Sequence, residues 1–171
     1  MQGSLGDCWF ISALSVLATR DELISGRIEG LTEENIKTFQ ANKQSAFDFS
    51  KGVYPGIFHL YRAKGIYVFR FFKDFRWIYV IIDDRIPCVD KQPVFSSCKD
   101  MRETWVSLIE KAYAKLHGCY EALISGCIDD ALSEMTGFVA EKLDLHDPKG
   151  NFPNRALGTK EQFWSYMKLR V

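Results

Sequence analysis

The sequence lacks an excess of either charge, a long apolar run and a regular cysteine pattern. Its 171 residues carry 22 basic and 22 acidic side chains, so charge gives no reason to expect nucleic acid or an anionic membrane as a partner. The longest apolar run, residues 8–18, contains two serines and is shorter than the roughly 20 residues that span a bilayer. It follows Asp7, has no basic residue ahead of it and has no cleavage-like ending, so a signal peptide is not indicated.

The cysteines exclude two further classes of protein. They number five, and no two form a C-x-x-C pair. An odd number at irregular spacings argues against a zinc cluster and against a secreted disulfide scaffold. We therefore expect reduced thiols in a cytoplasmic protein, most of them buried as small apolar side chains.

The apolar residues that are present predict an α+β domain over residues 1–171. The hydrophobic fraction of 47% is enough for a core. Helical periodicity, β-branched and aromatic runs, and turn residues mark the elements. We predict helices at 8–18, from about 31 onward, at 101–118, 128–135 and 159–169, and strands at 57–61, 66–72 and 76–82.

Capping residues define the ends of these predicted helices. Asp7 is a plausible cap for the first helix, which is apolar nearly all round and should therefore be a buried central helix. Asp100 fits the N-cap of the long helix with Glu103 at the capping-box position, and Gly118 ends that helix. Thr159 fits the N-cap of the last helix.

The segment with chemical potential is residues 2–9, Gln-Gly-Ser-Leu-Gly-Asp-Cys-Trp. A helix N-terminus stabilises a thiolate at Cys8, and a thiolate is the nucleophile of cysteine peptidases. Backbone N–H groups there and the Gln2 amide are suited to hold a developing oxyanion. The alternative interpretation is that Cys8 simply fills the core, and a nucleophile also needs a general base, normally His.

This segment resembles the active-site signature of the calpain family, Q-G-x-L-G-D-C-W. The resemblance continues in register through Y-P-G-I-F-H at 54–59, D-D-R-I-P at 83–87, W-V-S-L-I-E-K-A-Y-A-K at 105–115, G-C-Y-E-A-L at 118–123 and T-G at 136–137. It runs from Gln2 to about Leu145, whereas residues 31–51 resemble an insertion.

The resemblance implies the first lobe of a papain-like cysteine protease core, with a buried central helix, further helices and a small antiparallel sheet. Cys8 then matches the nucleophile and Gln2 the oxyanion-hole glutamine. The family carries its catalytic His, in a G-H-A-like strand, and an orienting Asn on a second lobe, and neither segment occurs here. We expect protein substrates to be cut only together with that second lobe of the same core, and the isolated chain to be inactive.

The three histidines of the chain are the candidates for an internal base. His59 lies in a predicted strand at a non-catalytic family position, and His117 ends the long helix. His146, with Asn151 shortly after it, is about as far from Cys8 as in papain-like enzymes. Because its surroundings predict a surface loop, an internal Cys8–His146–Asn151 site is the less favoured alternative.

The resemblance also implies a calcium ion in each lobe. Glu103 matches an acidic ligand that precedes the Trp of the long helix, and the family's other ligands come from a loop before the signature glutamine. Calcium takes about six to eight oxygens, so Glu103 alone makes no site. The adjacent pair Asp83 and Asp84 points to opposite faces of a strand and is interpreted as structural.

The substrate segment departs from the family pattern. The family often has a double glycine after Y-E-A-L-S, where substrate backbone binds, whereas residues 123–127 read Leu-Ile-Ser-Gly-Cys. Gly126 is the remaining candidate for substrate binding, and Cys127 is a candidate second exposed thiol. The overall prediction is one half of a calcium-dependent cytoplasmic endopeptidase. A non-catalytic calpain-like module that binds partners stays open, because Cys8 and Gln2 say nothing about the other half.

Overall fold

The computed structural model describes residues 3, 5–20, 23–24, 52–100, 102–147, 149–150 and 154–168. The chain divides into two compact units, Met1–Ala140 and Glu141–Val171. The predicted helix from about residue 31 and the insertion at 31–51 lie outside the described residues. Among the described helices, none combines the length and the apolar character needed to cross a bilayer.

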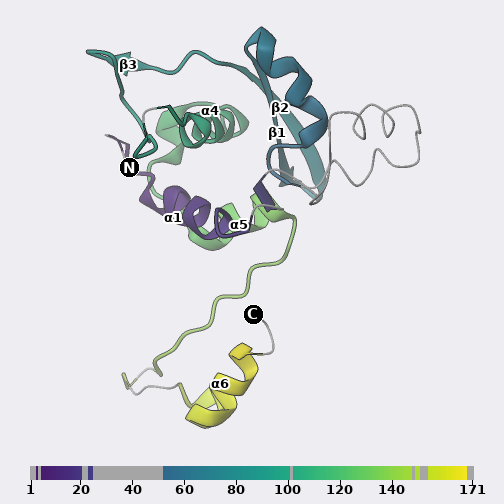
Figure 1. Ribbon diagram of the computed structural model, residues 1–171. Coiled ribbons are helices and arrows are strands. Elements are labelled where there is room, and N and C mark those ends of the chain that lie inside the picture. The colour runs from purple at the N-terminus through teal and green to yellow at the C-terminus, as the bar shows by residue number, and fades with distance from the viewer. Residues whose placement is uncertain are drawn as a thin grey trace, which may run out of the picture. The chain divides into compact units, whose positions relative to one another are not determined.

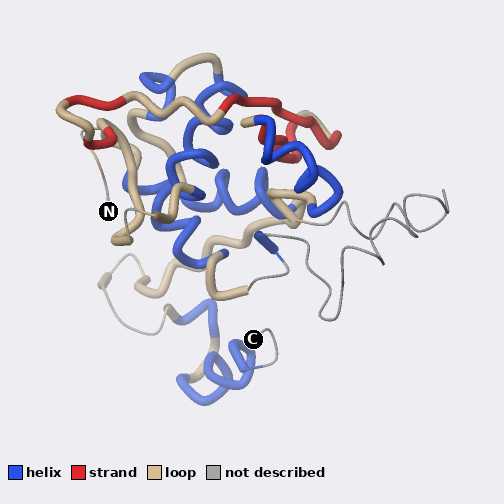
Figure 2. Tube along the Cα trace, turned by 45° about the horizontal axis from the view of Figure 1, so that its top comes forward, coloured by secondary structure: helices blue, strands red, loops and turns tan. Residues whose placement is uncertain are grey.

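The first unit combines helices with two small antiparallel sheets, as the α+β prediction expected. Figure 2 shows that its strands are confined to two hairpins, and that helices and loops make up the rest. Its elements are α1 (Cys8–Leu17), η2 (Gly56–Lys64), β1 (Ile66–Lys73), β2 (Arg76–Asp83), β3 (Cys88–Val89), β4 (Gln92–Pro93), α4 (Trp105–His117), η3 (Tyr120–Leu123) and α5 (Ile128–Thr136) (Figure 1). Here η denotes a 3₁₀ helix.

The hairpin of β1 and β2 confirms the two strands predicted at 66–72 and 76–82. The strands pair from Ile66 opposite Asp83 to Lys73 opposite Arg76. The two turn residues, Asp74 and Phe75, have left-handed φ values of 52° and 59°. Two such residues in succession give the turn whose twist matches that of antiparallel strands.

An aromatic cluster joins α1, α4 and β1 in the core of the first unit. Phe10 stacks on Tyr113 with ring centroids 4.2 Å apart, and Phe71 packs edge-on to Tyr113 at 5.5 Å. All three side chains are at most 1% exposed. Because buried aromatic rings dominate core energetics, this cluster fixes where α1 lies on α4.

Helix α1 was predicted to be a buried central helix, and among the described residues it buries one face in the core of the first unit. Phe10, Ala13, Leu14 and Leu17 face the core. Val16, in contrast, is 57% exposed. The opposite face of α1, which carries Val16, is not covered by the described residues of the first unit.

Residues 57–61 were predicted as a strand and instead lie in the 3₁₀ helix η2. The helix is bracketed by Pro55 and by Gly65, whose φ of 69° ends it. Meanwhile the Arg70 N–H of β1 donates to the Val53 carbonyl at 2.7 Å, so Val53 bonds to β1 where a further strand would pair. A short apolar run is compatible with a strand or with a helix, and it forms a strand only where a neighbouring strand is free to pair with it.

The long helix α4 begins at Trp105, four residues later than predicted. Asp100 does not cap it, because its carboxylate binds the backbone N–H of Arg102 at 2.9 Å and the Arg102 guanidinium at 2.7 Å. Thr104 takes the N-cap position without a side-chain bond. The capping-box role predicted for Glu103 is therefore wrong, whereas the end at Gly118, with φ 111°, is confirmed.

The other helix ends agree with the sequence. Helix α5 ends at the left-handed Gly137, as predicted. The second unit holds η4 (Arg155–Leu157) and α6 (Lys160–Lys168). Thr159 caps α6 reciprocally: its hydroxyl accepts the Gln162 N–H at 3.3 Å, and its own N–H donates to the Gln162 side chain at 2.8 Å.

Candidate active site

Cys8 is the first residue of α1 and its side chain is exposed. Asp7 precedes it at the N-cap, where its backbone carbonyl accepts the N–H groups of Phe10 at 2.9 Å and Ile11 at 3.1 Å. The Asp7 carboxyl makes no capping bond, so the side-chain cap predicted for it is wrong. The first-turn N–H groups of α1 are therefore not capped by the Asp7 side chain.

Two hydrogen bonds hold the start of α1 and the turn before it against the end of η3 and the segment that follows it. The Trp9 indole N–H donates to the Leu123 carbonyl at 2.9 Å, and the Ser125 N–H donates to the Gly6 carbonyl at 3.2 Å. Gly6 and Trp9, on either side of Cys8, thus lie beside residues 123–125, which are far away in the sequence and adjoin the predicted substrate residue Gly126.

Gly126 lies directly on the Trp9 ring. A Cβ at this position would overlap the indole, so the approach itself requires glycine. Ser125, just before it, has a left-handed φ of 68°. The structure therefore brings the candidate substrate residue Gly126 next to the residue that follows Cys8, and its role in substrate binding stays a prediction.

The exposure of the thiols corrects one prediction and confirms another. Most cysteines were expected to be buried, but only Cys98 is; the exposed ones are Cys8, Cys88, Cys119 and Cys127. Several lie at the starts of helices or in short strands rather than on core faces. Cys127, at the N-cap of α5, is an exposed thiol as predicted.

Gly3 connects the nucleophile segment to a second support. A side chain at Gly3 would overlap the backbone of Phe95, so the two backbones are in close contact. The Phe95 ring in turn stacks on Tyr120, with centroids 4.0 Å apart. The predicted oxyanion donor Gln2 lies outside the described residues, and its role stays a prediction.

A buried polar cluster, Asp7, Ser96 and Glu110, lies behind Cys8, and sequence reasoning missed it. All three residues are at most 1% exposed. The Ser96 N–H donates to both carboxyl oxygens of Glu110, at 3.0 and 3.2 Å, and the Ser107 hydroxyl donates to the Ser96 carbonyl at 2.7 Å. Burial and the neighbouring Asp7 carboxyl raise the pKa of Glu110, against the lowering effect of the side chain and the backbone N–H of Ser96. The one available signal was a glutamate that directly follows the apolar pair Leu108 and Ile109 within the long helix.

The histidines do not supply a base beside Cys8 among the described side chains of the first unit. His117 ends α4 as predicted, and both its ring nitrogens are engaged: Nε2 with Glu134 at 2.9 Å and Nδ1 with Lys73 at 3.1 Å. This cluster ties β1, α4 and α5 together and is structural. The His59 side chain and Asn151 lie outside the description, and His146 is exposed in the second unit, so the internal site stays untested.

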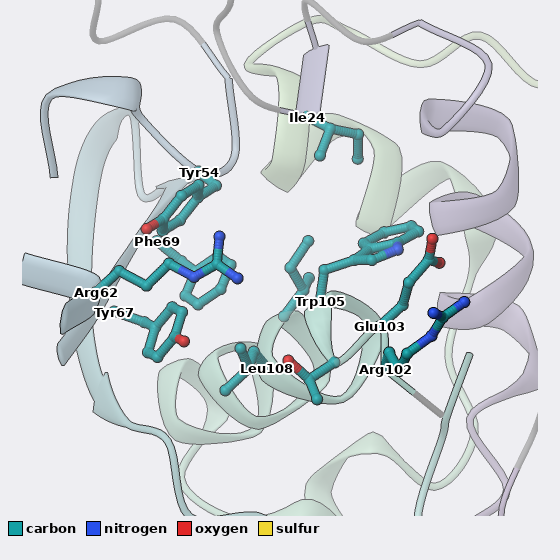
Figure 3. A pocket seen from close by; sticks show the side chains of 11 residues that line it. Ile24, Tyr54, Arg62, Tyr67, Phe69, Arg102, Glu103, Trp105 and Leu108 are labelled. Atoms are coloured by element: carbon teal, nitrogen blue, oxygen red, sulfur yellow. The ribbon is translucent and has the colours of Figure 1, made fainter. Parts of the chain in front are cut away.

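Glu103 lines a cavity of about 330 Å³ in the first unit. Figure 3 shows Glu103 and Arg102 beside Trp105, with Tyr67 and Arg62 across the cavity. Within the described part of the chain, no group of three or more His, Cys, Asp or Glu side chains is placed to hold a metal ion. The described surroundings of Glu103 therefore do not fit a complete calcium site. Asp83 is structural, as interpreted, because it binds the Lys111 ammonium group.

Comparison with known proteins matches this arrangement to one family. The sequence model described as "Calpain family cysteine protease" matches residues 1–170. A calpain-type cysteine protease of Zea mays is 40% identical over 149 residues, covering 86% of this chain and 6% of that protein. Calpain-5 of Mus musculus is 39% identical over 84% of this chain and 20% of its own length, and the calpain-2 catalytic subunit of Homo sapiens 35% over 88% and 18%. The chain thus spans a fifth or less of the length of these relatives.

Proposed function

Since the chain belongs to the calpain family of cysteine proteases, we propose that it is the nucleophile-bearing first lobe of a papain-like, calcium-dependent intracellular endopeptidase. The observation that carries this proposal is the exposed Cys8 at the uncapped start of α1, beside the Gly126 segment. A cysteine that only filled the core would be buried, as Cys98 is.

In the proposed reaction, the Cys8 thiolate attacks the carbonyl carbon of the scissile peptide bond. The Cys8 N–H and the Gln2 amide hold the resulting oxyanion. The tetrahedral species collapses to a thioester, and the leaving amine takes a proton from a histidine of the second lobe. Water, deprotonated by the same histidine, then hydrolyses the thioester and restores the thiol.

The open face of α1 supports a second lobe as the partner. Its two serine hydroxyls are already satisfied within the helix: Ser12 donates to the Cys8 carbonyl at 2.7 Å, and Ser15 to the Ile11 carbonyl at 2.9 Å. Covering this face would therefore leave no hydroxyl unpaired and would bury the exposed Val16. A lobe docked here would bring its histidine and asparagine to Cys8.

Protein substrates would run along residues 124–126. Ile124 is 56% exposed and offers an apolar contact, and Gly126 offers backbone without an obstructing side chain. We propose that the substrate backbone pairs with this segment. Calcium dependence is also proposed, with Glu103 supplying one carboxylate and the remaining ligands coming from outside the described residues.

The deciding experiment compares two exposed thiols in the full-length protein. A peptide electrophile is added with and without calcium, the adduct is located by mass spectrometry, and hydrolysis of a fluorogenic peptide is followed in parallel. We expect labelling at Cys8, loss of hydrolysis in Cys8→Ser, and retained hydrolysis in Cys127→Ser. Full-length protein that neither labels at Cys8 nor cuts the peptide would instead favour a non-catalytic module. Turnover by residues 1–171 alone, abolished by His146→Ala, would refute the two-lobe proposal.

A further inference from the structure

Two carboxyl groups are buried against each other directly behind Cys8. The Asp7 residue is 0% exposed and Glu110 is 1% exposed. After burial itself, the neighbouring Asp7 carboxyl is the largest influence that raises the pKa of Glu110. Among the described residues, neither Asp7 carboxyl oxygen has a hydrogen-bond donor.

Chemistry restricts how such a pair can exist. An ionised carboxylate only accepts hydrogen bonds, so two carboxylates cannot satisfy each other. Two adjacent buried negative charges also repel strongly in a medium of low polarity. One proton between the groups removes both problems, because it makes one group a donor and leaves a single shared negative charge.

We propose that Asp7 and Glu110 share one proton and that this pair positions the turn carrying the nucleophile Cys8 on α4. The positioning role rests on the proposed function, whereas the shared proton does not. Neither residue is assigned to contact substrate.

The surroundings of the pair agree with a single shared charge. The groups that act on Glu110 are the Asp7 carboxyl and the side chain and backbone N–H of Ser96, and Glu110 in turn acts on the Tyr120 phenol; none of these groups is a cation. The charge is thus solvated by the Ser96 N–H rather than by a salt bridge. Burial, followed by the charge on Glu110, raises the pKa of Tyr120, so that phenol stays neutral beside the pair.

The pair has two consequences for the reacting group. It turns the Asp7 side chain inward, which leaves the first-turn N–H groups of α1 uncapped for the thiolate and oxyanion. It also links α1 to the Phe95–Ser96 segment on which Gly3 lies, because Glu110 accepts the Ser96 N–H. The same network therefore supports the backbone on both sides of the signature segment.

Two substitutions separate a shared proton from simple packing. In Glu110→Gln, the amide donates to Asp7 as the carboxylic acid would, and the amide oxygen still accepts the Ser96 N–H. In Glu110→Ala, the donor and the volume are both lost. Glu121→Gln is the matched control, since it removes an exposed carboxylate nearby in the sequence.

The measurements are made on the full-length protein. Infrared spectra at neutral pH should show a protonated carboxylic acid in the wild type and in Glu121→Gln, and none in Glu110→Gln. Cys8 alkylation by iodoacetamide, located by mass spectrometry across pH, should stay within about twofold in Glu110→Gln. In Glu110→Ala we expect peptide hydrolysis to fall by on the order of tenfold to a hundredfold, as a small misplacement of a reacting group causes.

The outcomes distinguish the two proposals. A wild type without the protonated-acid band, or a Glu110→Gln variant that retains it, overturns the shared proton. Unchanged hydrolysis and Cys8 alkylation in Glu110→Ala overturn the positioning role. If Glu110→Ala fails to fold, hydrolysis by Glu110→Gln tests the positioning role instead. Hydrolysis close to wild type supports the role, and hydrolysis lost in a folded Glu110→Gln overturns it. A wild type with the band but without hydrolysis leaves the pair standing and refutes the proposed protease.

Discussion

The Trp9 indole and the Gly126 backbone are in contact, and this contact joins the start of α1 to the segment that leads into α5. The Trp9 indole N–H also donates to the Leu123 carbonyl at 2.9 Å, so two contacts hold the ring in place. Any shift of the Gly126 backbone must therefore move Trp9, and with it the adjoining Cys8.

Adding one methyl group at this contact should disable the proposed site. In Gly126→Ala, the Cβ would overlap the indole, so Trp9 and the start of α1 must move. We expect peptide hydrolysis to fall by on the order of a hundredfold, because small displacements of reacting groups have such effects. Trp fluorescence and hydrolysis rates measure the change.

Gly6→Ala provides the matched control for that substitution. A Cβ at Gly6 meets only the Ile124 side chain, at an ordinary 3.7 Å. We expect hydrolysis and Trp fluorescence close to wild type. Equal loss in both variants would mean that the signature glycines, rather than the Trp9 contact, explain the effect.

Backbone strain at Ser125 predicts a second pair of outcomes. Its φ of 68° suits glycine, and a β-branched residue is the least tolerant of this conformation. We expect Ser125→Val to lower the free energy of unfolding by about 1–3 kcal/mol, and Ser125→Gly to change it by less than about 1 kcal/mol. Urea unfolding measures both, and a Val variant as stable as wild type would contradict the strain.

Local signals in the sequence predicted much of this structure. The helix start at Cys8, the β1–β2 hairpin, the glycine ends of α4 and α5 and the Thr159 cap all depend on neighbouring residues. The family resemblance named Gly126 as a candidate for substrate binding, but no signal in the sequence predicted its contact with Trp9.

The predictions that failed depend on distant partners or on competition between neighbours. Residues 57–61 form no strand, since a strand needs a partner with a free edge. Asp100 caps no helix because Arg102 competes for its carboxylate. The Asp7–Glu110 pair was unforeseen because no periodicity shows which distant carboxyl groups meet in the core.

Removal of the Glu103 carboxylate tests the proposed calcium dependence. Calcium affinity depends on the number of charged ligands, so Glu103→Gln should need a severalfold higher calcium concentration for half-maximal hydrolysis. Glu121→Gln, which removes another exposed carboxylate, should leave the calcium titration unchanged. Hydrolysis by the wild type in the presence of a chelator would refute calcium dependence altogether.

The cluster of Lys73, His117 and Glu134 predicts that the free energy of unfolding decreases at acidic pH. Burial alone would raise the pKa of Glu134, but hydrogen bonds from His117 and Tyr113 and the Lys73 charge outweigh it and lower that pKa below 4.5. The unfolded state then binds the proton more readily, so this contribution is fully present above 4.5 and is lost as pH falls through the lowered value. Glu134→Gln should therefore be less stable than wild type by about 1–3 kcal/mol near neutral pH, with the difference shrinking in acid. Urea unfolding of both proteins across pH measures this, with Glu121→Gln as the exposed control. A difference that stayed constant down to acid pH would mean that Glu134 contributes through packing rather than through its charge.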